Sequence, residues 1–315
     1  MRPKFQCRKS LLSALALAAG LLALPACDVV DWGPSEKFSH DFHNAYPLNA
    51  DGRLTVETFN GPVEVSGWDQ NEIDISGTTY GPTQSAADNL RVDIDHQPDG
   101  VTIRVERPTD LRGNIGARFA IKVPRTARLD RITSSNGEIH TTGGAGPAHL
   151  RTSNGPIHVE ELKGDLNAET SNGRVELEDV SGDAVVHTSN GRIQTEGLTG
   201  SLDAATSNGG IRGEVAEGCR DVRAESSNGP IDLTLPADFA AQVHAHTSNG
   251  GITLHLPADI NANVSAHTSN SSISSEFDIR TQGTLSKHQL EGAIGAGGPL
   301  LDLRTSNGSI RLLKM

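Results

Sequence analysis

The sequence has few cysteines, few aromatic residues and few long apolar runs. Three cysteines occur in 315 residues, which is too few for the disulfide framework of a small secreted domain. Aromatic residues make up 3% of the chain, which counts against a ligand groove built from stacked rings. The formal net charge of -12 counts against binding to nucleic acid or to an anionic membrane surface. We therefore expect no nucleic-acid partner.

Motifs of the common enzyme classes are also missing. The sequence contains no nucleophile elbow, phosphate-binding loop, His-Glu-x-x-His zinc motif or Cys-x-x-Cys pair. Serine is frequent, but it recurs within one repeated turn, and so many copies of a turn indicate architecture rather than catalysis. We therefore expect a protein that is not an enzyme and needs no cofactor.

The N-terminus has the order of a secretory signal. Basic side chains cluster within residues 1–9, and residues 11–24 are uncharged and mostly apolar. This run is shorter than the roughly 20 residues of a membrane-spanning helix, which favours a cleaved signal peptide over residues 1–26. Cys27 follows Ala26, and a cysteine after a small residue resembles a bacterial lipobox. The resemblance implies lipid on the thiol of Cys27; the alternative is an ordinary signal peptide with a chance cysteine.

A lipidated Cys27 predicts a cell-envelope protein that is attached to the membrane by its N-terminal lipid. Asp28 resembles an inner-membrane retention signal, so both a periplasm-facing inner-membrane site and the outer membrane stay open. Residues 27–50 are predicted to be a tether, in which three aromatic residues spaced by four form a short helical face or dock on the first coil. Cys219 would then have no intramolecular partner, and we expect it to be buried; the alternative is a disulfide to a second chain.

A Ser-Asn-Gly turn recurs through the chain. The asparagines of successive regular copies are 18 residues apart four times, then 20, 21, 21 and finally 37. Thr or Ser stands two positions before each asparagine, Ile or Val stands three positions after it, and Gly follows it except at Ser271. The aligned asparagines are Asn60, Asn136, Asn154, Asn172, Asn190, Asn208, Asn228, Asn249, Asn270 and Asn307.

Each repeat holds two short stretches of alternating apolar and polar residues, which predicts two β-strands with one buried face. A repeat of 18–21 residues is too short for a strand–helix–strand crossover but suffices for one coil of a solenoid. The buried positions do not recur every six residues, which argues against a left-handed hexapeptide helix. The sequence therefore predicts an all-β parallel β-solenoid of the single-strand β-helix type. It is either flattened into two sheets or irregular, and it is right-handed, with coils about 4.8 Å apart.

The distribution of aromatic residues separates two regions. Most of them fall between residues 28 and 120, so residues 51–132 are predicted to form a β-rich N-terminal cap that includes the first coil. Residues 133–315 are predicted to be solenoid repeats with a thin aliphatic core. The final coil, residues 301–313, resumes the repeat and is expected to close the C-terminal end.

Stacked coils would place the asparagines of successive turns one above another. We expect each asparagine to be buried, to donate its amide N–H to one neighbour and to accept from the other, because a buried amide must find partners. The glycine that follows suits a turn with a positive φ or a close backbone approach. The expected cost of Asn172→Ala is about 1–3 kcal/mol.

Three features resemble a known bacterial family. They are the stretch Leu-Thr-Val-Glu-Thr-Phe-Asn-Gly-Pro-Val-Glu-Val at residues 54–65, Ile-Lys-Val-Pro at residues 121–124, and the repeated Thr/Ser-Ser-Asn-Gly turns. Over residues 51–315 the chain is similar to the bacterial "putative adhesin" family of β-strand repeats, a domain of unknown function, here in a lipoprotein form. The resemblance implies the repeat fold and an adhesive role, and it brings no catalytic residues.

Two outward columns of side chains are candidate binding sites. Six positions after the asparagine stand Glu160, Glu178, Glu196 and Glu214. They predict either a cation-binding stripe, with Ca²⁺ as the natural oxygen-ligated ion, or a solvated edge relieved by nearby arginines.

The second column lies three positions before the asparagine. In it Arg151 and Glu169 are predicted to pair across adjacent coils. His246 and His267 are predicted neighbours, which could supply two ligands to Zn²⁺ or Cu²⁺ or could be exposed histidines without a metal.

Three functions are compatible with these features. The first is a non-enzymatic, lipid-anchored scaffold that presents its polar columns to a protein or glycan. The second is an envelope-stress or signalling accessory that binds a membrane-protein partner. The third is a polysaccharide-active solenoid enzyme, which the scarcity of aromatic residues in the repeats disfavours.

Overall fold

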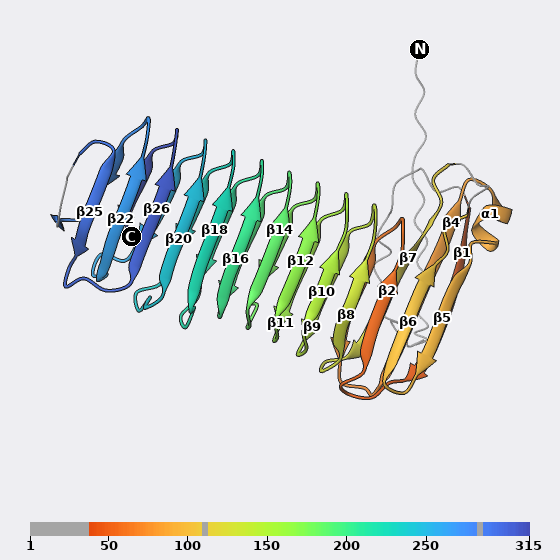
Figure 1. The fold of residues 1–315 in the computed structure, drawn as a ribbon. Coiled ribbons are helices and arrows are strands. Elements are labelled where there is room, and N and C mark those ends of the chain that lie inside the picture. The colour runs from red at the N-terminus through yellow and green to blue at the C-terminus, as the bar shows by residue number, and fades with distance from the viewer. Residues whose placement is uncertain (1–37, 109–112, 282–285) are drawn as a thin grey trace, which may run out of the picture. The chain divides into compact units, whose positions relative to one another are not determined.

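The computed structural model describes residues 38–108, 113–281 and 286–315, which form 27 strands in two sheets and one helix, α1 (Gln84–Asp88) (Figure 1). The predicted signal peptide, Cys27 and the first part of the predicted tether lie outside the described residues. In these three ranges no helix combines the length and the apolar character that a membrane crossing requires.

Sheet A has 13 strands and is parallel except at its N-terminal edge. Its strands, in spatial order, are β1 (Phe38–Pro47), β4 (Glu72–Gly81), β7 (Gly116–Pro124), β3 (Val63–Trp68), β9 (Ile139–Gly144), β11 (Ile157–Leu162), β13 (Val175–Glu178), β15 (Ile193–Leu198), β17 (Ile211–Val215), β19 (Ile231–Thr234), β21 (Ile252–Leu256), β27 (Ile310–Lys314) and β23 (Ile273–Ser275).

Sheet B has 14 strands and is antiparallel only at its two ends. Its strands, in spatial order, are β24 (Ile279–Thr281), β25 (Gln289–Ile294), β22 (Ala262–Thr268), β26 (Leu300–Thr305), β20 (Gln242–Thr247), β18 (Asp221–Ser226), β16 (Ser201–Thr206), β14 (Ala184–Thr188), β12 (Leu166–Thr170), β10 (Ala148–Arg151), β8 (Arg128–Thr133), β2 (Arg53–Glu57), β6 (Gly100–Val105) and β5 (Val92–Gln97).

Each regular coil contributes one strand to each sheet, and the coils stack in register. In sheet A, Ile157 lies opposite Val175, which lies opposite Ile193, and all three are 0% exposed. In sheet B, Leu166 lies opposite Ala184. The inward residues therefore form continuous aliphatic columns between the sheets, as the alternation predicted. The predicted fold class, a parallel β-solenoid, is confirmed in its two-sheet form, and its right-handedness stays a prediction.

A buried hydroxyl joins each regular coil to the one before it. The Oγ1 of Thr170 donates to the carbonyl oxygen of Gly155 at 3.0 Å and accepts from the N–H of Gly173 at 3.2 Å. The same two bonds recur at Thr152, Thr188, Thr206, Ser226, Thr247 and Thr305. These hydroxyls satisfy backbone groups that would otherwise be buried without partners.

The glycine of each turn is required by a close backbone approach. A Cβ on Gly173 would lie 1.8 Å from the carbonyl oxygen of Gly155 in the preceding coil. Gly173 does not have a positive φ. Of the two reasons that the sequence left open for this glycine, close packing between coils is therefore the one that applies.

At both ends the coils are not stacked in chain order. The last coil, β26 and β27, inserts between β20/β21 and β22/β23. At the other end, β2 and β3 lie between β6/β7 and β8/β9. The prediction that residues 301–313 close the C-terminal end is wrong, because a long connection lets this coil return inside the stack.

Antiparallel strands flank the stack at both ends of sheet B and at the N-terminal end of sheet A. At the N-terminal end, β1 pairs with β4 and β5 pairs with β6, and at the C-terminal end β25 pairs with β22 and β24. The prediction of a tether is therefore wrong for residues 38–47. Even spacing places Phe42 and Tyr46 on one face of β1, and Phe42 packs edge-on against Phe119 with ring centroids 6.2 Å apart. Covered ends protect the unpaired strand edges that an open solenoid would expose.

Candidate functional site

The asparagines of the turns form a ladder on the surface. The Nδ2 of Asn172 donates to Oδ1 of Asn154 at 2.7 Å, and Oδ1 of Asn172 accepts from Nδ2 of Asn190 at 2.7 Å. This bond joins nine exposed asparagines in the spatial order Asn136, Asn154, Asn172, Asn190, Asn208, Asn228, Asn249, Asn307 and Asn270. The prediction that these amides are buried is wrong, because the turn directs the Thr or Ser two positions earlier inward.

Asn60 has different partners. Its Nδ2 donates to Oδ1 of Asn114 at 3.1 Å and to the carbonyl oxygen of Ile115 at 2.9 Å. The Nδ2 of Asn136 donates to the carbonyl oxygen of Phe59 at 3.3 Å. Asn60 therefore ties the first coil to the connection that precedes β7.

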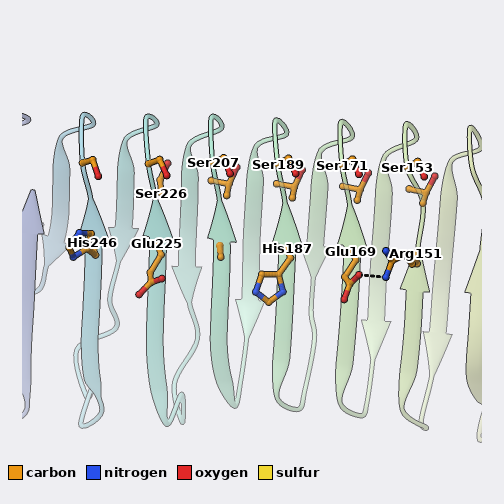
Figure 2. Close-up of a pocket in the computed structure, with 17 residues that line it drawn as sticks. Arg151, Ser153, Glu169, Ser171, His187, Ser189, Ser207, Glu225, Ser226 and His246 are labelled. Atoms are coloured by element: carbon orange, nitrogen blue, oxygen red, sulfur yellow. Dashed lines mark hydrogen bonds and ion pairs between the residues drawn. The ribbon is translucent and has the colours of Figure 1, made fainter.

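A groove crosses sheet B beside the Ser-Asn-Gly turns and has a volume of about 590 Å³ (Figure 2). Six successive coils line it with the same two positions, the serine before the asparagine and the outward residue two positions earlier. These side chains are Arg151, Ser153, Glu169, Ser171, His187, Ser189, Ala205, Ser207, Glu225, Ser227, His246 and Ser248. All but one are polar or charged, so the groove is suited to hydrogen bonds along its length.

Two predicted contacts beside the groove have different outcomes. The pair of Arg151 and Glu169 is confirmed, with Nη1 and Oε2 2.6 Å apart (Figure 2). The prediction that His246 and His267 are neighbours is wrong, because Arg304 of the inserted last coil lies between them in the register of sheet B. The predicted two-histidine metal site therefore does not form.

The column of four glutamates does not form a single cluster. Glu160 lies opposite Glu178, and Glu178 lies opposite Glu196, on the outer face of sheet A. The register between β15 and β17 shifts before Glu214 is reached. Glu160 is half-buried and the other three are exposed. Of the four, only Glu160 lies in a group of three metal-ligand candidates within the described part of the chain.

That group joins Glu160 to two histidines that the sequence reasoning missed. The Oε1 of Glu160 lies 2.7 Å from Nε2 of His158 and 3.4 Å from Nε2 of His140. On its other side, Nδ1 of His158 lies 3.1 Å from Oε2 of Glu176. Partial burial lowers the pKa of His158, but the hydrogen bonds to Glu160 and Glu176 outweigh it and hold this pKa above its ordinary value.

A signal for this group was present in the repeat. Four positions after the asparagine stand His140, His158 and Glu176 in consecutive coils, and Glu160 stands two positions beyond His158. Residues two apart share a face of a strand, and equivalent positions of adjacent coils are neighbours. Aligning this fourth position as well as the sixth would have brought the four side chains together.

In two successive coils, the turn at the opposite end of the sheet B strand carries an aspartate, Asp165 before β12 and Asp183 before β14. The N–H of Asp183 donates to Oδ1 of Asp165 at 3.0 Å, and the N–H of Ser201 donates to Oδ1 of Asp183 at 2.9 Å. Arg220 forms an ion pair with the same oxygen of Asp183. The Ser201 N–H, helped by Arg220 and opposed by slight burial, holds the pKa of Asp183 below its ordinary value.

Cys219 is buried, as predicted, with 8% of its surface exposed. Burial raises the pKa of its thiol, so the reactive thiolate is disfavoured. This cysteine is therefore a packing residue of the core rather than a candidate nucleophile.

Comparisons with known proteins concern the whole repeat region. A family model described as Toastrack DUF4097 matches residues 53–313. A solved structure of a "putative adhesin" from Bacteroides fragilis NCTC 9343 is 13% identical, with 88% of this chain and 97% of that chain covered and a TM-score of 0.39. A "putative lipid binding protein" from Parabacteroides distasonis ATCC 8503 is 12% identical, with 89% and 98% covered and a TM-score of 0.39. No curated protein matches the chain.

Proposed function

Since the chain belongs to the Toastrack DUF4097 family over residues 53–313, we propose that it is a non-enzymatic adhesion scaffold of the cell envelope, which presents the sheet B groove to an extended protein or glycan. The family match confirms the β-strand-repeat resemblance that was drawn from residues 51–315. The observation that carries the proposal is the repetition of two polar positions along the groove in six consecutive coils.

The groove is long and rigid. Six coils at strand spacing extend over about 24 Å, which suits an extended polymer better than a compact small molecule. The hydroxyl bonds between coils fix the backbone that carries the lining side chains, for example between Thr170 and Gly155. A preorganised surface loses less conformational entropy when it binds, which supports a binding role.

The carboxylates of the groove are spaced unfavourably for glycoside hydrolysis. Glu169 and Glu225 are separated by three coil intervals, which is about 14 Å at strand spacing. Glycosidases that use two carboxylates hold them about 5–9.5 Å apart. This spacing counts against the polysaccharide-active alternative and supports a groove that binds without cleaving.

The proposal includes attachment to the membrane through lipid on Cys27, which the order of residues 1–27 supports. Its test is Cys27→Ser in the producing bacterium, followed by membrane fractionation and metabolic labelling with a fatty-acid probe. We expect the wild-type chain to take up the label and sediment with membranes, and the variant to lose both properties. A variant that keeps label and sedimentation would contradict the lipid anchor.

Binding by the groove is tested with a bulky side chain inside it. Ser189→Trp places an indole in the groove, and Gln194→Trp places one on the exposed face of sheet A in the same coil. Retention of the purified chain is measured on immobilised envelope polysaccharides and on immobilised envelope proteins. We expect Ser189→Trp alone to lose retention on one of the two surfaces. Equal retention of both variants and the wild type would remove the groove as the binding surface.

Crosslinking in intact envelopes separates the proposed scaffold from the signalling alternative. Crosslinks to a glycan or to several surface proteins that are lost in Ser189→Trp would support the scaffold. Capture of one dominant membrane-protein partner, unaffected by Ser189→Trp, would instead favour an envelope-signalling accessory.

A further inference from the structure

Three consecutive coils bring together a cluster of two histidines and two glutamates on the outer face of sheet A. His140 of β9 lies opposite His158 of β11, which lies opposite Glu176 of β13. Glu160 follows His158 by two residues on the same face of β11. This cluster belongs to the opposite sheet from the groove, so it is independent of the proposed function.

The ligand atoms of three of these residues converge. Nε2 of His140 and Oε1 of Glu160 are 3.4 Å apart, and the ligand atoms of His140, His158 and Glu160 all lie within 4.8 Å of one another. The two imidazole rings are perpendicular, with centroids 4.9 Å apart. Ligands of a tetrahedral ion with bonds of about 2.1 Å are about 3.4 Å apart, so the His140–Glu160 distance already fits an ion between them.

A second observation points to a metal rather than to a simple ion pair. The Nδ1 of His158 lies 3.1 Å from Glu176, whose other oxygen is 3.3 Å from Nε of Arg174. Histidines that bind metals usually donate their other ring N–H to a carboxylate, which fixes the tautomer and orients the ring. Glu176 is placed to do this, which leaves Nε2 of His158 to face Glu160 and His140.

We propose that His140, His158 and Glu160 form a binding site for a divalent transition-metal ion of the Zn²⁺ type, with Glu176 as the carboxylate that positions His158. Two imidazole nitrogens and one carboxylate oxygen suit Zn²⁺, whereas Ca²⁺ takes six to eight oxygens. Three protein ligands leave one tetrahedral position, which water fills. A bound ion comes between Nε2 of His158 and Oε1 of Glu160, so their 2.7 Å contact opens by about 0.7 Å.

The side chains are partly accessible, so an ion can enter from solvent. The exposed fractions are 35% for His140, 34% for Glu160 and 21% for His158. The ligands come from two adjacent strands near the junction of the cap and the repeats. A bound ion therefore clamps β9 to β11 and stabilises the folded chain in proportion to its occupancy.

The first experiment is calorimetric titration of the purified chain with ZnCl₂, about one pH unit above the ordinary pKa of histidine. We expect one Zn²⁺ per chain, a higher melting temperature with Zn²⁺, and no effect of CaCl₂. We expect His158→Gln and Glu160→Gln to weaken binding more than about 100-fold, and Glu176→Gln to weaken it about 10- to 100-fold. The matched control is His149→Gln, an exposed histidine on sheet B, which should bind like the wild type.

A spectroscopic readout keeps the test decisive if a variant is destabilised. Co²⁺ added to the wild type should give the visible absorption of a four-coordinate nitrogen and oxygen site, and this absorption should be lost in His140→Gln, whose side chain is the most exposed of the three. Far-ultraviolet circular dichroism establishes that each variant is folded before it is titrated. Absence of Zn²⁺ heat and of a melting shift in the wild type, or equal loss in His149→Gln and His158→Gln, would overturn the site.

Discussion

The hydroxyl of Thr170 reaches the carbonyl oxygen of Gly155, fifteen residues earlier in the chain and one coil away, at 3.0 Å. The same hydroxyl accepts the N–H of Gly173 at 3.2 Å, so it serves both the adjacent coil and its own turn. Thr170 is 7% exposed, and the groups that it joins are inside the structure. We therefore expect the buried hydroxyl to stabilise the repeated turn more than the exposed asparagine does.

Thr170→Val tests this order. Valine keeps the shape of threonine but leaves the carbonyl of Gly155 and the N–H of Gly173 without their partner. We expect the free energy of unfolding to fall by about 1–3 kcal/mol in chemical denaturation. Thr170→Ser is the control and should cost less than about 1 kcal/mol, because serine keeps the hydroxyl and stands naturally at Ser226. Equal losses in both variants would show that the methyl group, not the hydroxyl, matters.

Gly173→Ala tests the close packing of successive turns. The added Cβ would lie 1.8 Å from the carbonyl oxygen and 2.4 Å from the carbonyl carbon of Gly155, so the two coils must separate. We expect a loss of at least about 3 kcal/mol. The control is Gly100→Ala, where the nearest atom to the new Cβ is 3.4 Å away. A melting temperature that falls equally in both variants would indicate a general effect of replacing glycine in a strand.

One turn has Ser271 in place of the glycine, and its position in the stack agrees with close packing as the reason for glycine elsewhere. Ser271 belongs to the coil of β22 and β23, which has a parallel neighbour on one side only. A coil at the edge of the parallel stack can shift away from its neighbour and accommodate a Cβ. A coil in the middle is held from both sides and cannot.

Asn172→Ala should lower the free energy of unfolding by less than Thr170→Val does. The amide of Asn172 is exposed, so water replaces its bonds to Asn154 and Asn190 when it is removed. We expect a loss of about 1 kcal/mol, the low end of the range expected for a buried amide. Glu178→Gln, an exposed side chain of the same coil, should leave unfolding unchanged within about 0.5 kcal/mol. A loss for Asn172→Ala greater than for Thr170→Val would reverse the proposed order.

The repeated positions could be predicted from the sequence because they obey a local rule. The alternation of apolar and polar residues predicts which side chains face inward. The constant offset from the asparagine places Ile157, Val175 and Ile193 in one column. Whether the side chain of a turn residue is buried or exposed follows no such rule. Asn172 and Thr170 are two positions apart, yet the path of the turn buries the threonine and exposes the amide.

The order of the coils at the two ends could not be predicted for a related reason. Every coil carries the same columns, so the pattern fits β27 equally well beyond β23, at the end of the stack, or between β21 and β23, where it lies. The choice depends on contacts between segments that are distant in the sequence, such as the pairing of β25 with β22, and these follow no local pattern. The cluster of His140, His158 and Glu160, by contrast, follows from register alone and was within reach of the sequence.

The acidic turn of Asp183 makes stability depend on pH in a defined direction. The N–H of Ser201 and the guanidinium of Arg220 favour the carboxylate, so the pKa of Asp183 is lower in the folded chain than in the unfolded one. The unfolded chain therefore binds the proton more tightly. The stabilising contribution is complete above the ordinary pKa of aspartate, about 3.9, and is lost as the pH falls through the lower folded value.

Asp183→Asn isolates this contribution, because asparagine still accepts the N–H of Ser201 but has no charge. We expect the wild type to be more stable than the variant near neutral pH, and the difference in unfolding free energy to shrink as the pH falls below about 4. Denaturant titrations of both proteins across this range measure the difference, and other carboxylates cancel between them. Arg220→Gln should reduce the same difference without abolishing it, because the Ser201 N–H is the larger cause. A difference that is constant with pH would mean that Asp183 acts through its shape and its backbone hydrogen bond, not through its charge.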